Sequence, residues 1–119
     1  MTQPMKTITE KVVGTTFYDI DPYDIYGKHE EDVGKNTLTT LAILVKEPGN
    51  PYDPQAISVY VKQHSTGKPA KIGHIGRNSE IYNLINSSNS DKINAILNVD
   101  IYDDYSYNPK YTVTLALSS

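Results

Sequence analysis

The chain has 119 residues, 11 lysines and arginines against 14 aspartates and glutamates, a net charge of −3 and no cysteine. A chain of this length forms one domain, and the lack of cysteine excludes a disulfide framework, a thiolate nucleophile and a cysteine-based zinc site. The acidic balance argues against a protein that coats nucleic acid through charge alone, and no apolar run approaches the roughly 18 residues of a membrane span.

The N-terminal part of the chain combines two predicted strands with a long polar segment between them. Residues 11–17 are predicted to form the first strand. Residues 18–36 are acidic and short of aliphatic side chains, so we expect an inserted loop there. Residues 41–45 are continuously apolar, which is typical of a strand covered on both faces.

The middle of the chain contains two further predicted strands and the one clear helix. In residues 57–62 apolar and polar side chains alternate, and residues 70–75 complete a second strand. Asn78 is expected to cap the helix. Its apolar stripe consists of Ile81, Leu84 and Ile85, and the polar residues 87–90 end it.

The last third of the chain has the clearest alternation. Ile93, Ala95, Leu97, Val99 and Ile101 share one parity, with Asn94, Asn98 and Asp100 on the other, which predicts a strand with one buried face. Asn108-Pro109 predicts a turn, and residues 111–117 alternate again. Six short strands with one or two short helices predict a mainly β fold, a small six-stranded OB-like Greek-key barrel. We expect a single domain over residues 1–119, with its core at about 10–117.

The basic residues gather in the middle of the chain. Between Lys46 and Arg77 there are five basic and two acidic residues, whereas the rest of the chain has six basic and twelve acidic ones. An anion-binding surface must therefore use this middle part. The lysines in it are expected to be solvated individually.

The loop that follows the strand at 41–45 is unusually stiff. Between Glu47 and Ala56 it contains three prolines, which fix φ, and Gly49, which can adopt a positive φ. A simple hairpin needs only two to five linking residues. The loop is therefore built to present Tyr52 and Asp53 rigidly, which lowers the ordering cost of binding.

A second segment brings basic groups to the start of the helix. In Lys71-Ile-Gly-His-Ile-Gly-Arg-Asn78 a strand ends, the helix begins, and His74 and Arg77 come close to the first helical amides. Helix N-termini bind anions, and arginine grips phosphate with two parallel bonds. Arg77 is the only arginine in the chain.

Three stretches of the sequence together resemble the HIRAN domain family. They are Lys46-Glu-Pro-Gly-Asn-Pro-Tyr-Asp-Pro-Gln-Ala-Ile-Ser-Val59, then Ile72-Gly-His-Ile75, with Val13-Gly14 near the start. The resemblance covers most of the chain and is closest to the stand-alone bacterial or phage-type members. It implies an OB-like barrel that binds single-stranded DNA at a free 3′-hydroxyl end.

The resemblance also implies roles for individual residues. Tyr52 would lie against the terminal nucleotide, Asp53 would accept a hydrogen bond from the 3′-hydroxyl, and Asn50 would help to shape the pocket. His74 and Arg77 would hold the adjacent phosphate. Because an internal nucleotide has no free 3′-hydroxyl, the carboxylate would favour an end and disfavour a continuous strand or a 3′-phosphate.

One position departs from the family pattern. Where DNA-binding members carry an arginine followed by an aromatic residue, this chain has Thr16-Phe17. Phe17 keeps a ring for stacking on a base, but Thr16 supplies no cation. The site would then contact only about two phosphates, and we expect weak binding.

The same residues also have structural interpretations. Asp53 can accept a hydrogen bond from the amide of Gln55 in an Asx-turn, and Tyr52 can be a half-buried anchor of the loop. His74 shares a strand face with Ile72 and can be a partly buried histidine with a satisfied ring.

No catalytic or metal-binding pattern is recognisable. The three histidines lack metal spacing, and the chain has no nucleophile elbow or glycine-rich phosphate loop. We therefore expect a non-catalytic module without cofactor that binds single-stranded DNA 3′ ends, alongside a protein partner in DNA processing. The alternative is a protein-interaction module that uses the acidic loop and has lost DNA-end binding. The polar N-terminus resembles no signal peptide, so a cytoplasmic protein away from membranes is expected.

Overall fold

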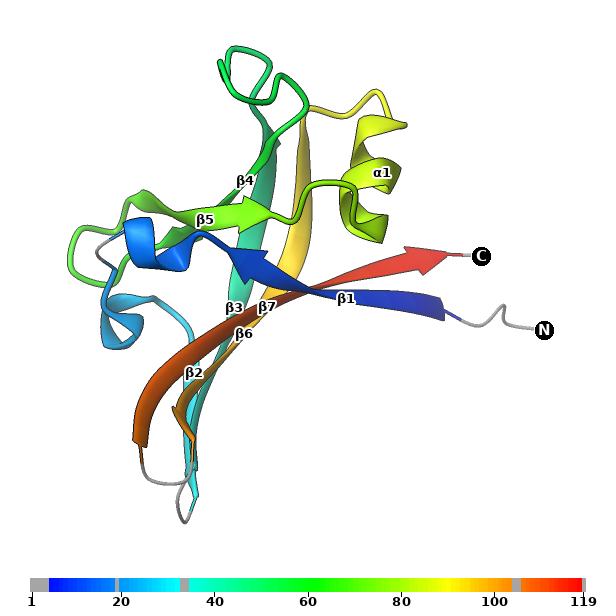
Figure 1. Cartoon of the computed structure of the whole chain (residues 1–119). Helices are drawn as coiled ribbons and strands as arrows, with labels where there is room; N and C mark the ends of the chain where they lie inside the picture. Colours follow the sequence, from blue (N-terminus) through cyan, green and yellow to red (C-terminus); the bar gives the residue numbers. More distant parts are fainter. Residues whose placement is uncertain (1–4, 19, 33–34, 104–105, 119) are drawn as a thin grey trace.

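The computed structural model describes residues 5–18, 20–32, 35–103 and 106–118. Within these ranges it contains strands, two short 3-10 helices and one α-helix (Figure 1). In chain order the elements are β1 (Met5–Val13), η1 (Thr15–Phe17), η2 (Pro22–Asp24), β2 (Lys28–Asp32), β3 (Lys35–Lys46), β4 (Ile57–Lys62), β5 (Pro69–Ile75), α1 (Glu80–Asn86), β6 (Lys92–Asp103) and β7 (Ser106–Ser118).

Six of these strands form a closed antiparallel barrel. Around the barrel the order is β3-β4-β5-β1-β7-β6, and β6 pairs again with β3. β1 and β7 run side by side over most of their length (Figure 1). Between β1 and β5 the ladder has only the pairs Val12↔Ile75 and Val13↔His74. The expected mainly β, OB-like barrel is confirmed.

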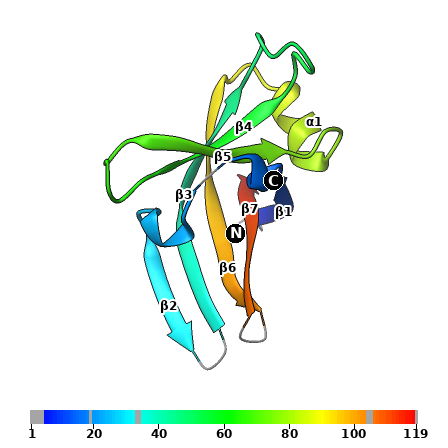
Figure 2. The ribbon, with the colours of Figure 1, turned by 60° about the vertical axis from the view of Figure 1, so that its left-hand side comes forward.

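A seventh strand lies outside the barrel and corrects the prediction of a loop over residues 18–36. β2 pairs with the first half of β3, from Lys28↔Thr39 to Asp32↔Lys35, as Figure 2 shows. All five β2 residues are exposed and polar, so the sequence has no apolar–polar alternation that would predict this strand. The free edge of β3 holds it through backbone hydrogen bonds. Residues 19, 33 and 34 of the predicted loop lie outside the described residues.

The strand predicted over 41–45 has only one covered face, contrary to expectation. Ala42 and Leu44 are fully buried, whereas Leu41 is 70% exposed and Ile43 is 39% exposed. A barrel has a single interior, so alternate residues of β3 must point outward. The continuous apolar run therefore places aliphatic side chains on the outer surface.

The predicted end of the first strand and the predicted turn at Asn108-Pro109 are both wrong because of local backbone geometry. β1 ends at Val13, since Gly14 adopts φ 73° and residues 15–17 form η1 instead of strand. Asn108-Pro109 makes no turn and lies within β7, where the register against β6 shifts between Asp100 and Tyr102. Proline has no amide to donate and is tolerated at such a bulge.

The core fills the barrel interior, and α1 packs against one end of it. Ile81, Tyr82 and Ile85 of α1 are buried, and Leu84 is 36% exposed, so Tyr82 takes the place that the predicted stripe gave to Leu84. The helix is capped by Ser79, whose Oγ accepts the amide of Tyr82 at 3.2 Å. No helix in the described ranges is long and apolar enough to cross a membrane.

Candidate nucleic-acid interface

The stiff loop between β3 and β4 comprises residues 47–56 and is called the β3–β4 loop. It lies against residues 74–79, which run from the last two residues of β5 to the start of α1 and are called the β5–α1 corner. His74 Nε2 lies 2.8 Å from Glu47 Oε1, and Arg77 Nε lies 4.0 Å from Asp53 Oδ2. In Figure 1 the loop rises above the barrel on the side of α1. The two segments that the sequence singles out therefore form one surface.

Side chains within the β3–β4 loop fix its shape. Asn50 Oδ1 accepts the amides of Tyr52 at 2.9 Å and Asp53 at 3.1 Å. Asp53 Oδ1 in turn accepts the amide of Gln55 at 2.9 Å, so the expected Asx-turn is present. Asn50 is thus engaged in holding the loop, and its bonds orient the two residues that follow Pro51.

Two aromatic rings of this region project into solvent. Tyr52 is 92% exposed, so its interpretation as a half-buried anchor is wrong, and Phe17 at the end of η1 is 86% exposed. The neighbour of Phe17, Tyr18, lies beside β5, with its ring centroid 6.2 Å from that of His74. Exposed rings on ordered segments provide flat apolar faces on which a base can stack.

Asp53 combines its loop role with a link to α1. Its carboxylate accepts the hydroxyl of Tyr82 at 3.0 Å on Oδ2 and 3.2 Å on Oδ1, and its side chain is only 17% exposed. Burial and the bond to Asp53 raise the pKa of Tyr82 above its usual 10.0, so the hydroxyl stays protonated. Nothing in the sequence pattern of α1 marks Tyr82 as a partner of the loop.

A carboxylate in this position still has room for a further donor. An ionised carboxylate accepts about four hydrogen bonds. The amide of Gln55 and the hydroxyl of Tyr82 occupy mainly Oδ1 and one side of Oδ2. By this count the carboxylate has capacity for at least one more hydrogen bond.

Glu47 holds the other end of the loop to β5. Its carboxylate accepts Lys71 Nζ at 2.9 Å and His74 Nε2 at 2.8 Å. The side chains of all three residues are only 21–26% exposed. Lys71 was expected to be solvated and is instead part of this cluster, which no sequence pattern predicted.

The environment of Glu47 strongly favours its ionised form. Burial acts to raise the pKa of Glu47, but the neighbouring hydroxyl of Ser58 and the bonds from Lys71 and His74 outweigh it and lower the pKa from 4.5 to about 2. The Ser58 Oγ is fully buried without a hydrogen-bond partner of regular geometry in the described structure. We therefore assign the effect mainly to Lys71 and His74, as charge-assisted bonds are the stronger ones.

The two basic residues predicted to hold a phosphate differ in availability. Arg77 is exposed (71% of its side chain), with its guanidinium at the edge of the Asp53 carboxylate. His74 is committed to Glu47, which fits its interpretation as a partly buried histidine with a satisfied ring. The helix cap predicted at Asn78 is wrong, since Ser79 caps α1. With only seven residues, α1 also gives little support to the anion site expected at its first amides. Asn78 instead adopts φ 65°.

Gly73 lets β5 approach β1 where the corner begins. A Cβ at this position would lie 2.6 Å from the carbonyl oxygen of Val13 and 2.7 Å from Val12 Cγ1, whereas a Cβ at Gly76 would meet nothing closer than 3.9 Å. We expect Gly73→Ala to lower the free energy of unfolding by about 1–3 kcal/mol through overpacking. Gly76→Ala, the matched control, should change it by less than about 0.5 kcal/mol. Urea unfolding checks this, and equal midpoints for both variants would refute it.

The comparison with known families agrees with these features. The HIRAN domain matches residues 6–113 of the chain. The chain belongs to the HIRAN family. No curated protein and no solved structure is significantly similar to it. The resemblance carried by the β3–β4 loop and the Ile-Gly-His segment is thus confirmed, and membership of this family indicates DNA binding.

Proposed function

We propose that this HIRAN domain is a non-catalytic cytoplasmic module that binds single-stranded DNA at a free 3′-hydroxyl end. The observation that carries the proposal is the juxtaposition on one surface of the exposed Tyr52 ring, the Asp53 carboxylate and the Arg77 guanidinium. An aromatic face, a hydroxyl acceptor and a phosphate-binding cation are the three groups that a terminal nucleotide requires.

The carboxylate gives this surface its preference for an end. A 3′-hydroxyl donates to Asp53 Oδ2, whereas an internal nucleotide brings a phosphodiester and a second negative charge to the same place. The hydroxyl of Tyr82 and the amide of Gln55 donate to the carboxylate and hold it in position before binding. A preorganised acceptor costs little further ordering when the nucleotide arrives.

We expect the domain to bind single-stranded DNA weakly. Lys71 and His74 already neutralise Glu47, and Thr16 supplies no charge. Arg77 is then the main cation for the terminal phosphate. Each phosphate that a cation neutralises contributes a salt slope of only about −0.7 on single strands.

A short oligonucleotide tests the proposal. A 5′-fluorescein trithymidylate with a free 3′-hydroxyl should bind in fluorescence anisotropy at low salt. Tyr52→Ala should weaken this binding about fivefold or more, since a stacked base contributes about 1–3 kcal/mol. The oligonucleotide should be recovered intact, as the module is non-catalytic.

The matched control is Tyr107→Ala, which removes an exposed tyrosine of β7 that lies against Tyr102. It should leave the affinity for the trithymidylate unchanged within twofold. No binding at all, or equal losses in both variants, would count against the proposal. The protein-interaction alternative predicts no response to DNA.

A further inference from the structure

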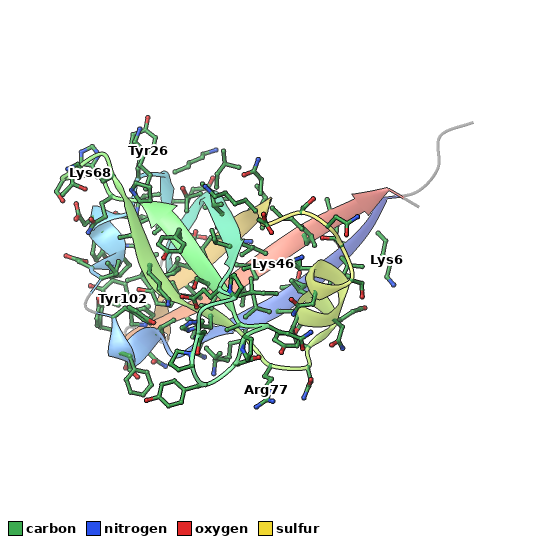
Figure 3. All side chains as sticks on the ribbon, turned by 90° about the horizontal axis from the view of Figure 1, so that it is seen from above. Lys6, Tyr26, Lys46, Lys68, Arg77 and Tyr102 are labelled. Carbon is green, nitrogen blue, oxygen red and sulfur yellow. The ribbon has the colours of Figure 1, made fainter. Side chains whose placement is uncertain are left out.

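A groove lies on the outside of the barrel, at the edge of the molecule opposite to Arg77. It measures about 710 Å³ and lies among η2, β2, β3 and the β4–β5 turn. The side chains that matter for its chemistry are Tyr23, Tyr26, Lys28, His29, Lys62 and His64. Tyr26 and Arg77 lie at opposite edges of the molecule in Figure 3, with β4 and β5 between them.

Aromatic rings in the groove are paired and partly exposed. Tyr23 stacks on His29 with a centroid distance of 5.8 Å, and Tyr26 stacks on His64 at 6.1 Å. Tyr23 is 44% exposed and Tyr26 is 55% exposed. Each tyrosine is therefore braced by a histidine and keeps ring surface for a further flat group.

Basic side chains outnumber acidic ones in the described lining of the groove, and one of them, Lys28, is paired with Glu30. The described lining contains two lysines and two histidines but no aspartate or glutamate. Lys62 Nζ lies 4.8 Å from the centre of the Tyr26 ring. At least four carboxylates lie near the rim. Asp21 accepts the amide of Tyr23, and burial, Tyr102 and Glu31 each raise the pKa of Tyr23. Glu30 pairs with Lys28 at 3.2 Å, and Asp24 accepts the amide and hydroxyl of Ser65.

Outward-facing residues of β4 and β5 lie between this groove and the β3–β4 loop. On β4, Val59 and Val61 face the core, so Tyr60 and Lys62 face outward. Tyr60 pairs with Lys71 of β5, two residues after the start of the strand that leads to the corner. A second hollow of about 440 Å³ contains Tyr60 and shares Lys62 with the groove.

We propose that the DNA strand on the 5′ side of the bound 3′ end crosses the outer face of β4 and β5 and enters the groove at Tyr26. The proposal rests on the proposed function for the end itself and adds a second contact region for the same strand. Bases stack on Tyr60, Tyr26 and Tyr23, while Lys62 lies along the backbone. Exposed rings with a lysine beside them and no carboxylate in the described lining suit single-stranded nucleic acid.

Oligonucleotide length separates the two contact regions. A 5′-fluorescein dT12 with a free 3′-hydroxyl should bind at least tenfold more tightly than the trithymidylate, which reaches only the Asp53 site. An OB fold covers about 4–16 nucleotides. Tyr26→Ala and Lys62→Ala should each weaken dT12 about threefold or more and leave the trithymidylate unchanged within twofold. Lys62→Ala should also make the salt slope for dT12 shallower by about 0.7.

Lys11→Ala is the charge-matched control, because Lys11 is exposed on β1 and pairs with Thr112 of β7. It should affect neither oligonucleotide by more than twofold. Equal affinities of dT12 and the trithymidylate, or dT12 binding that is indifferent to both groove variants, would overturn the inference and leave end binding intact. If Tyr52→Ala leaves the trithymidylate unaffected while the groove variants weaken dT12, end binding at Tyr52 fails and the groove stands.

Discussion

Single-stranded DNA with a free 3′-hydroxyl is expected to bind at least tenfold more tightly than the same strand with a 3′-phosphate. A phosphate at about 4 Å from the Asp53 carboxylate is repelled by about 1 kcal/mol in water and about 4 kcal/mol at the effective dielectric of a protein surface. Tenfold corresponds to 1.4 kcal/mol. Arg77, 4.0 Å from Asp53, offsets part of this repulsion. We therefore expect the ratio of the two affinities to be nearer to tenfold than to the value for the full repulsion.

Variants of Asp53 and Arg77 separate the two contributions. Asp53→Asn keeps an oxygen for the amide of Gln55 and the hydroxyl of Tyr82 but removes the charge, so the preference should fall below about threefold. Asp53→Ala should abolish the preference as well. Arg77→Ala should weaken both oligonucleotides. Anisotropy titrations with the two trithymidylates give these ratios, and a preference that survives in Asp53→Asn would contradict the role of the carboxylate.

Glu47→Gln is expected to lower the free energy of unfolding by about 2 kcal/mol at pH 7. The folded-state pKa of Glu47 is about 2 against an ordinary 4.5, which corresponds to about 3 kcal/mol of linked stability. Partial exposure of the side chain, 25%, reduces the expected value. Because the folded pKa is lowered, this stability is present above pH 4.5 and is lost as the pH falls toward 2.

The pH dependence distinguishes this linkage from a packing defect. The stability difference between the wild type and Glu47→Gln should shrink as the pH falls from about 5 to 2. Glu80→Gln is the control, since Glu80 forms an exposed pair with Lys6 at 3.9 Å and such pairs contribute little. Chemical denaturation at pH 7, 5 and 3 measures the difference, and a gap that stays constant would contradict the ion-pair account.

The sequence predicts the barrel well where burial alternates along a strand. Ala95, Leu97, Val99 and Ile101 of β6 are all buried, as their period of two indicates. β2 was not predicted because its five residues are all exposed and polar and show no alternation between apolar and polar side chains. Its position depends on pairing with β3, which begins at Lys35 directly after it, and not on burial of its own side chains.

The candidate site is predicted in part for a similar reason. The stiff loop and the basic corner are visible as motifs, and the Asx-turn of Asp53 follows from local chemistry. The bonds from Tyr82 to Asp53 and from Lys71 to Glu47 join residues 29 and 24 positions apart. Such partners depend on how α1 and β5 pack against the loop, so no spacing rule anticipates them.

Mapping of a bound trithymidylate by NMR tests the central claim most directly. Titration of the ¹⁵N-labelled protein with the 3′-hydroxyl trithymidylate should shift the amides of Tyr52, Asp53 and Arg77 most, because the proposed site for the terminal nucleotide is between the β3–β4 loop and the β5–α1 corner. Amides of the β1–β7 ladder, such as Thr9, should stay in place. Shifts confined to residues away from these two segments, or none at saturating concentrations, would contradict the account.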